Sequence, residues 1–312
     1  MRFVAAAVLI ACVTKAQNTP PELPKPPQPP KNEASLEQNL AATELRNLGK
    51  TMTIPFQCTD EDISWAGMSC TEEEPCPVYV DMATLEVLGN RLIVVGNIHG
   101  ESTTLYSLLL ISDDGGAIWR EPFERLRGTG LDHLEFIDFQ NGWISGATLV
   151  PLPRDPFFLI TSDGGKTWRQ RSLFSEGGGG AIQQFWFESA TNGSLVIDRM
   201  ASADAARYEL YESANGGESW TVRRTSEKPI PLKRAASDAS APGWRIRADA
   251  RTKSYVIEKR QGDRWSATAS FLIQIGTCQS VPRASAPPPE TEETPAPAPP
   301  TAQRPPPKKP KK

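Results

Sequence analysis

The chain has 312 residues, 38% of them hydrophobic, which is enough apolar material to bury a sizeable core. Its formal net charge is −3 and its lysines and arginines are scattered, so the sequence predicts no nucleic-acid partner. The 29 prolines are too many for one compact domain, and over half of them lie in 17–34 and 281–312. We expect these two segments to be an extended linker and a disordered tail with a basic end.

The N-terminus predicts export. Residues 1–16 have the form of a signal peptide, with Arg2 followed by a short apolar run that cannot span a bilayer. Leu9-Ile10-Ala11-Cys12 resembles a lipobox, which makes Cys12 a candidate for lipidation, whereas 14–16 offers a weaker site for ordinary signal peptidase. The protein is therefore expected to be periplasmic, secreted or lipid-anchored in the envelope, without a transmembrane segment.

After the linker, residues 35–49 predict one amphipathic helix. Ser35 to Gln38 has the form of a capping box, and leucines at helical spacing follow as far as Gly49. The apolar stripe needs a surface to dock on, and the folded domain itself is the favoured one.

Four cysteines remain beyond Cys12, and they allow three pairings. They contain no C-x-x-C pair, and the chain has only two histidines, so the spacing favours disulfides over zinc. The four are Cys58, Cys70, Cys76 and Cys278.

From about residue 52, short apolar runs alternate with turn residues, and one eight-residue motif recurs. It has the form S/T-x-D/N-x-G-x-x-W and is called the Asp box below. The three copies contribute Ser112, Asp114, Gly116 and Trp119; Thr161, Asp163, Gly165 and Trp168; and Ser213, Asn215, Gly217 and Trp220. A degenerate fourth copy, 258–265, keeps Gly262 and Trp265 but has Arg260 where the Asp should stand.

The residue types of the Asp box predict structural roles. The Asp or Asn side chain and the hydroxyl accept hydrogen bonds from the following turn, glycine supplies positive φ, and tryptophan packs into the core. The Asp box is therefore a strong indicator of the fold, but it says almost nothing about activity.

A second landmark precedes each Asp box by a nearly constant interval. It is an Asn/Gly hairpin signal, at Gly89-Asn90, Asn141-Gly142 and Asn192-Gly193. Each unit of about 50 residues therefore predicts four strands, the period of a propeller blade. We expect an all-β fold, a small or partial β-propeller of four to five four-stranded blades over 52–280. Because a propeller brings its chain ends together, Cys58–Cys278 and Cys70–Cys76 are the preferred pairs.

The motifs resemble the BNR or Asp-box repeats of sialidases, sortilin-type receptors and the photosystem II assembly factor. The segment 136–146, FIDFQNGWISG, is most similar to the strand preceding the Asp box in the assembly-factor group. That resemblance implies a non-enzymatic scaffold that holds a protein partner. The family usually has seven blades, whereas the repeat region of this chain has room for only four or five. The resemblance therefore implies a smaller ring or an open arc completed by another subunit.

No complete catalytic constellation is found. A sialidase would need an arginine cluster, a Tyr–Glu pair and a further acid, and the Phe-Arg-Ile-Pro segment is absent. Tyr208 and Tyr211 lie near Glu209 and Glu212, but strand alternation predicts ordinary positions for them. The histidines, His99 and His133, lack a nucleophile-elbow serine, and the acidic runs 60–62 and 72–74 lack calcium-ligand spacing.

The sequence therefore predicts no catalytic residue, cofactor or metal site. We expect an exported, non-enzymatic scaffold that engages a protein partner. The alternative is a carbohydrate-binding protein or sialidase-like glycoside hydrolase, which would need carboxylates and arginines converging in a central funnel.

Overall fold

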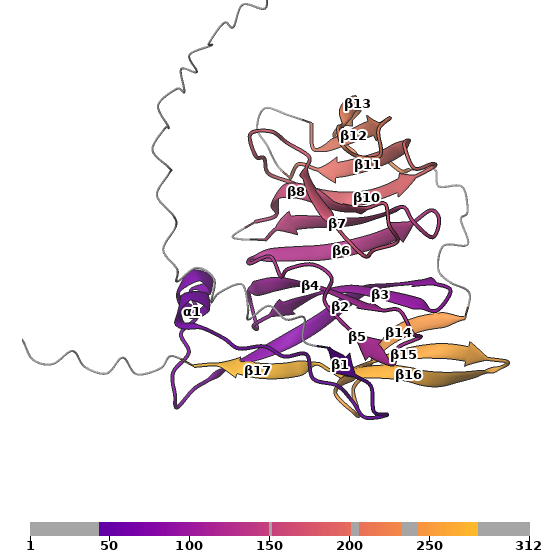
Figure 1. Cartoon of the computed structure of the whole chain (residues 1–312). Helices are drawn as coiled ribbons and strands as arrows, with labels where there is room; N and C mark the ends of the chain where they lie inside the picture. The colour runs from indigo at the N-terminus through magenta and orange to yellow at the C-terminus, as the bar shows by residue number, and fades with distance from the viewer. Residues whose placement is uncertain (1–43, 150–151, 201–205, 233–242, 280–312) are drawn as a thin grey trace, which may run out of the picture. The chain divides into compact units, whose positions relative to one another are not determined.

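The computed structural model describes residues 44–149, 152–200, 206–232 and 243–279, and nearly all of its regular structure is β-strand (Figure 1). The predicted signal peptide, the two Pro-rich segments and most of the helix predicted at 35–49 lie outside these residues. Within them, no helix is long and apolar enough to cross a membrane.

Four antiparallel sheets follow one another along the chain, and we call them blades 1 to 4. Blade 1 consists of β2 (Cys76–Leu88), β3 (Arg91–His99), β4 (Thr104–Ser112) and the C-terminal β17 (Gln274–Cys278). Blade 2 consists of β6 (Thr129–Phe136), β7 (Gly142–Thr148), β8 (Arg154–Thr161) and β9 (Arg169–Ser172).

Blade 3 consists of β10 (Ala181–Phe187), β11 (Gly193–Asp198), β12 (Tyr208–Ser213) and β13 (Thr221–Ser226). Blade 4 consists of β14 (Trp244–Asp249), β15 (Ser254–Gln261) and β16 (Arg264–Leu272). Two short strands, β1 (Leu45–Arg46) and β5 (Ile118–Trp119), pair with each other. The all-β fold is confirmed, with three four-stranded blades and one blade of three strands among the described residues.

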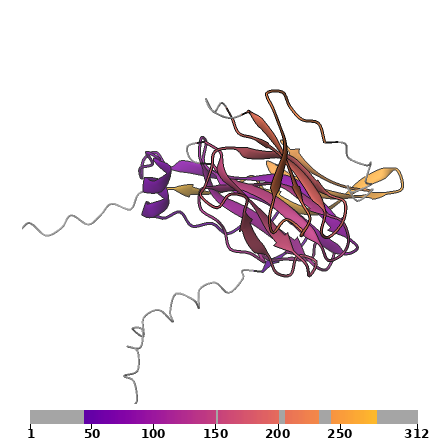
Figure 2. The same ribbon diagram turned by 90° about the horizontal axis from the view of Figure 1, so that it is seen from above.

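The blades pack face to face because side chains alternate across each strand, and three hydrophobic clusters fill the spaces between them. One cluster joins blade 4 to blade 1, with Trp119 edge-on to Phe271 at 5.2 Å between ring centroids. The second joins blade 1 to blade 2, and the third joins blade 2 to blade 3. Figure 1 shows the sheets stacked in this order, and the view from above in Figure 2 shows them overlapping.

A closed four-bladed ring has four interfaces between blades, and the described residues form three of them. No core cluster among them joins blade 3 to blade 4; the fourth cluster belongs to blade 3 and the segment that follows it. The blades therefore form an open arc in the order 4, 1, 2, 3, and each end of the arc presents a sheet face that no further blade of the described chain covers.

The Asp boxes make the turn that their residues predict. In the second copy, Asp163 Oδ1 accepts hydrogen bonds from the backbone N–H groups of Lys166 and Thr167 at 2.9 and 3.0 Å. Gly165 N–H donates to Thr161 Oγ1 at 2.9 Å. The Trp168 indole donates to the Gly165 carbonyl at 3.1 Å. The first and third copies repeat the indole bond.

Each Asp box also docks on the hairpin signal of its own blade. The N–H groups of Gly115, Gly164 and Gly216 donate to the carbonyls of Asn90, Gln140 and Thr191 at 2.8, 2.9 and 2.8 Å, respectively. The constant interval between the two landmarks thus reflects a recurring contact.

Acid weakens the second Asp box. Partial burial alone would raise the pKa of Asp163, but hydrogen bonds from Thr167, Thr161 and Lys166 outweigh it and lower the pKa to about 2. Because the folded-state pKa is depressed, its contribution is present above pH ~4 and is lost as the pH falls towards ~2. The free energy of unfolding falls between neutral and acidic pH, and in Asp163→Asn this fall should be about 1 kcal/mol smaller than in the wild type. The value allows for solvent screening of a partly exposed carboxylate. Urea denaturation at pH 7 and pH 2.5 measures it, with Asp263→Asn as the control; equal pH dependence in both variants would contradict it.

Two sequence predictions are corrected. The described part of 35–49 is not helical: Leu45 and Arg46 form β1, which pairs with β5, and Leu48 is exposed. The backbone hydrogen bonds of this segment are therefore made with another strand. The fourth motif, 258–265, is not an Asp box but a tight hairpin between β15 and β16 turning at Gly262, because Arg260 cannot cap the turn as Asp does.

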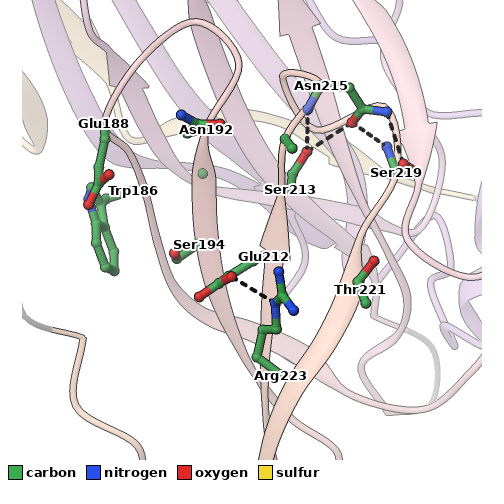
Figure 3. Close-up of a pocket in the computed structure, with 12 residues that line it drawn as sticks. Trp186, Glu188, Asn192, Ser194, Glu212, Ser213, Asn215, Ser219, Thr221 and Arg223 are labelled. Carbon is green, nitrogen blue, oxygen red and sulfur yellow. Dashed lines mark hydrogen bonds and ion pairs between the residues drawn. The ribbon is translucent and has the colours of Figure 1, made fainter.

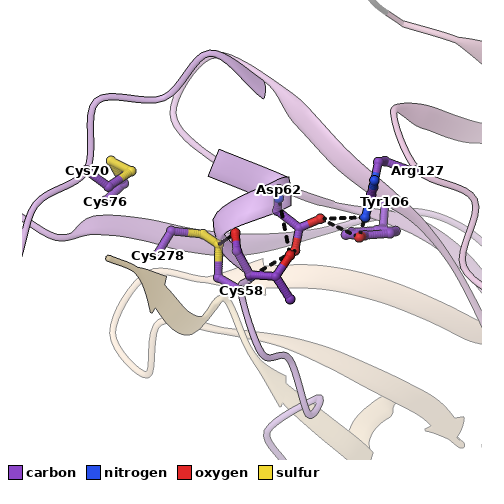
Figure 4. The surroundings of a disulfide bond; sticks show 8 residues. Cys58, Asp62, Cys70, Cys76, Tyr106, Arg127 and Cys278 are labelled. Carbon is purple, nitrogen blue, oxygen red and sulfur yellow. Dashed lines mark hydrogen bonds and ion pairs between the residues drawn. A yellow bond between two sulfur atoms is a disulfide. The ribbon is translucent and has the colours of Figure 1, made fainter. Parts of the chain in front are cut away.

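Two disulfides form within the described residues, and they are the pairs preferred from the sequence: Cys58–Cys278 and Cys70–Cys76 (Figure 4). Cys278 is also the strand partner of Cys76. The C-terminal strand is thereby held in blade 1.

A short helix, α1 (Asp60–Ala66), follows Cys58, where the sequence shows only an acidic run. Thr59 and Asp62 form its capping box, and Asp62 is fully buried. Its carboxylate accepts a hydrogen bond from the Tyr106 hydroxyl of β4 and lies 3.3 Å from Arg127 (Figure 4). Asp62 thus anchors the helix to blade 1.

Candidate functional site

The outer face of blade 3 is the face turned away from blade 2. Along β10, Phe185 and Phe187 point towards blade 2 and belong to the core between the two sheets. Alternation turns Trp186 to the opposite face. Trp186 is paired across the sheet with Ser194, which is paired with Glu212. This row lies where a following blade would pack in a closed ring.

The segment after β13 covers one part of this outer face. Ile230 is buried against Val196 and Tyr208, with Leu232 packed alongside. The Gln184 side-chain amide donates to the Ile230 carbonyl at 2.9 Å, which fixes the segment to β10. The apolar part of the face is therefore satisfied within the chain, and the polar part with Trp186 is left open.

The open part is a depression of about 570 Å³ (Figure 3), within the size range of ligand sites. Its lining combines one aromatic ring with amides, hydroxyls and charged groups. The side chains drawn and labelled are Trp186, Glu188, Asn192, Ser194, Glu212, Ser213, Asn215, Ser219, Thr221 and Arg223.

The charged groups of the depression differ in their pairing. Arg223 Nε donates to Glu212 Oε2 at 2.8 Å, so the two charges neutralise each other (Figure 3). Glu188 is exposed, and its carboxylate has no ion-pair partner among the described residues. The depression therefore carries unpaired negative charge on the Trp186 side.

A second hollow, of about 440 Å³, adjoins the first one. It lies where the first strands of blades 1, 2 and 3 each bulge, between Met82 and Thr84 in β2, Leu131 and Leu134 in β6, and Ile182 and Gln184 in β10. Bulges turn side chains out of the regular alternation. The hollow is lined by Ala83, Thr84, Asp132, His133, Gln183, Gln184, Phe185, Trp186 and Leu232.

Trp186 lines both hollows and is therefore the centre of the candidate site. The sequence favours a buried core position for Trp186 over a place on a partner-binding rim, whereas the structure leaves it half-buried on the outer face of blade 3. The signal that identifies it is the pattern Phe185-Trp186-Phe187, in which only one of three aromatic side chains can face away from blade 2. Nothing in that pattern shows that the opposite face stays uncovered.

Tyr208 and Tyr211 lie on opposite faces of blade 3. Tyr211 packs in the core beside blade 2, and its hydroxyl donates to Glu209 Oε2 at 2.6 Å. Tyr208 packs under Ile230 on the outer face. Burial and the Glu209 carboxylate raise the pKa of Tyr211. This is the wrong direction for a phenolate nucleophile.

The two hollows do not present the carboxyl pair of a glycoside hydrolase in its usual environment. Such an enzyme keeps one carboxyl protonated by desolvation, opposite a second, ionised one. The second hollow contains a single carboxylate, Asp132. The first contains Glu188 and Glu212, both of which are exposed to solvent.

The histidines occupy packing positions. His99 Nδ1 lies 2.6 Å from the Gly100 carbonyl, and the His133 ring packs edge-on to Phe185 at 5.2 Å between centroids. Within the described residues, no group of three His, Cys, Asp or Glu side chains is placed to hold a metal ion.

No family model matches the chain. No curated protein matches it either. Solved structures do match, at low similarity. "YCF48 bound to D1 peptide" is 18% identical, with a TM-score of 0.33 over 64% of this chain and 60% of that one. YCF48 from Cyanidioschyzon merolae is 17% identical, with a TM-score of 0.30 over 62% and 56%.

The endosialidase of phage phi92 is 12% identical, with a TM-score of 0.39 over 72% of this chain and 51% of that one. The chain thus spans about 60% of the first of these proteins and less of the other two. At this level of likeness the matches assign no role to any residue.

Proposed function

We propose that the protein is a non-enzymatic binding protein of the Asp-box type that engages a protein partner through the open outer face of blade 3, around Trp186. The observation that carries the proposal is the position of Trp186: partly exposed, between two hollows, on a face that no described blade covers. Partly exposed aromatic side chains in such positions commonly dominate the energy of protein interfaces.

Two further features support an exported scaffold. The two disulfides suit an oxidising compartment, in keeping with the export signal predicted at 1–16 and with either lipidation at Cys12 or soluble release. The Pro-rich segments 17–34 and 281–312 would then serve as spacers on either side of the arc.

Substitution of Trp186 should weaken partner binding enough to prevent capture. Truncation of a central aromatic side chain typically costs 2 kcal/mol or more, roughly a 30-fold loss of affinity. Cross-linking capture from intact cells producing tagged protein, followed by mass spectrometry, should recover one stoichiometric protein with the wild type and not with Trp186→Ala. Trp265→Ala is the matched control, because Trp265 is exposed on β16 and lies outside both hollows. Equal capture by both variants would contradict the proposal.

A carbohydrate ligand is the second candidate, because the depression around Trp186 also contains the amide and hydroxyl groups of Asn192, Ser194 and Asn215. An aromatic ring with such groups suits a sugar. Recovery of glycan fragments without a stoichiometric protein, lost in Trp186→Ala, would favour this candidate.

A further inference from the structure

Most carboxylates of blade 3 form ion pairs with arginines of the same chain. Asp198 is paired with Arg207 at 2.9 Å, Glu209 lies 3.6 Å from Arg199, and Glu212 is paired with Arg223. Glu188, which immediately follows β10, has no such partner in the described residues and is exposed. The unpaired negative charge of the sheet is therefore at Glu188.

A second unpaired carboxylate lies on the other side of Trp186. Asp132, at the β6 bulge, is exposed and lines the second hollow together with Trp186. Its backbone carbonyl accepts a hydrogen bond from Thr84 Oγ1 at 2.9 Å, whereas its carboxylate has no cationic partner in the described chain. The bulge of β6 is what places an acidic side chain at the edge of this hollow.

Trp186 thus stands between two unpaired carboxylates, one in each hollow that it lines. Glu188 lies two residues along the same face, about 7 Å away in the backbone. Arg224, an arginine of the same face without an ion-pair partner in the described chain, is on β13, three strands away and thus about 14 Å from β10. Among the described residues, the charged side chains without an ion-pair partner in the two hollows are therefore both carboxylates.

We propose that Trp186, Glu188 and Asp132 form a binding site for the cationic side chain, arginine or lysine, of an extended segment of the protein partner. A cation over an indole face is attracted by the ring, and flanking carboxylates add charge-assisted hydrogen bonds. A planar guanidinium can stack on the ring and bond a carboxylate at its edge, so arginine is preferred over lysine. The inference rests on the proposed function and specifies what the surface recognises.

The test uses the intact protein and the blocked pentapeptide Gly-Gly-Arg-Gly-Gly, with the same peptide carrying neutral citrulline as the matched ligand. Binding is followed by NMR through the indole N–H resonance of Trp186, assigned with Trp186→Phe. The arginine peptide should shift this resonance in a saturable manner, with a Kd at least five-fold below that of the citrulline peptide. Glu188→Gln and Asp132→Asn should each weaken the arginine peptide about three- to ten-fold. Glu101→Gln, the same charge change in an exposed loop outside both hollows, should leave it unaltered.

The outcomes separate this inference from the proposed function. Equal binding of the two peptides, or no saturable shift with the arginine peptide up to about 5 mM, overturns the cation site. The cation site is also overturned if a neutral glucan tetrasaccharide shifts the Trp186 resonance and the arginine peptide does not. If partner capture still depends on Trp186 in these cases, the proposed function stands without a cation site; if it does not, both fail.

Discussion

Replacing Cys58 and Cys278 together by alanine should lower the free energy of unfolding by about 5 kcal/mol, the value that loop-closure entropy gives for a loop of this length. The bond joins residues separated by 220 positions, so it constrains nearly all of the described chain in the unfolded state. In the folded state it fixes β17 beside β2, at the junction of blades 1 and 4.

The Cys70–Cys76 bond provides the matched control, because it closes a loop of only six residues. The same entropy relation gives about 2 kcal/mol for its removal. Each pair contains one buried cysteine, Cys278 or Cys70, so the loss of packing is similar in the two double variants. Urea denaturation of both variants and the wild type measures the difference, and a larger loss on removal of Cys70–Cys76 would contradict the role given to the long loop.

Replacing Trp143 by alanine should cost about 3–5 kcal/mol, as is typical of a large aromatic side chain removed from a core. Trp143 is 1% exposed and stacks on Phe187 of blade 3 with 3.6 Å between ring centroids. Its indole N–H also donates to the carbonyl of Gly216, in the third Asp box, at 2.9 Å. One side chain therefore joins two blades by both packing and a hydrogen bond.

Trp143→Phe should separate the two contributions, because it keeps an aromatic ring but leaves the Gly216 carbonyl without its donor. We expect a loss of about 1–2 kcal/mol. Trp265→Ala should cost less than about 1 kcal/mol, because Trp265 is exposed and its main contact is a guanidinium, Arg245, above the ring. Denaturation midpoints that do not distinguish Trp143→Ala from Trp265→Ala would show that the blade 2–blade 3 interface does not hold the arc together.

The sequence predicts the blades because their signals are local. An Asp box contains its own hydrogen-bond partners within a few residues, as Thr161 and Asp163 show, and the Asn/Gly hairpins are equally local. The same locality explains why the fourth motif misleads. Gly262 and Trp265 alone suit a tight hairpin as well as they suit an Asp box.

The remaining features depend on contacts between distant parts of the chain. Leu45 and Arg46 become a strand because Ile118 and Trp119 offer them a partner, which no helical periodicity can indicate. The role proposed for Trp186 likewise depends on an outer face of blade 3 that no described blade covers, and on bulges that place Asp132 in the same hollow. Strand alternation predicts that Trp186 faces away from Phe185, but not what lies on that side.

The central claim is that the open outer face of blade 3 is the partner-binding surface, and hydrogen exchange of the protein with and without its captured partner tests it most directly. The account predicts slower amide exchange in the loops that border the depression, 188–193 and 214–219, and in 227–232, with no change in the β14–β16 sheet. Protection confined to β14–β16, with the blade 3 loops unaltered, would contradict it.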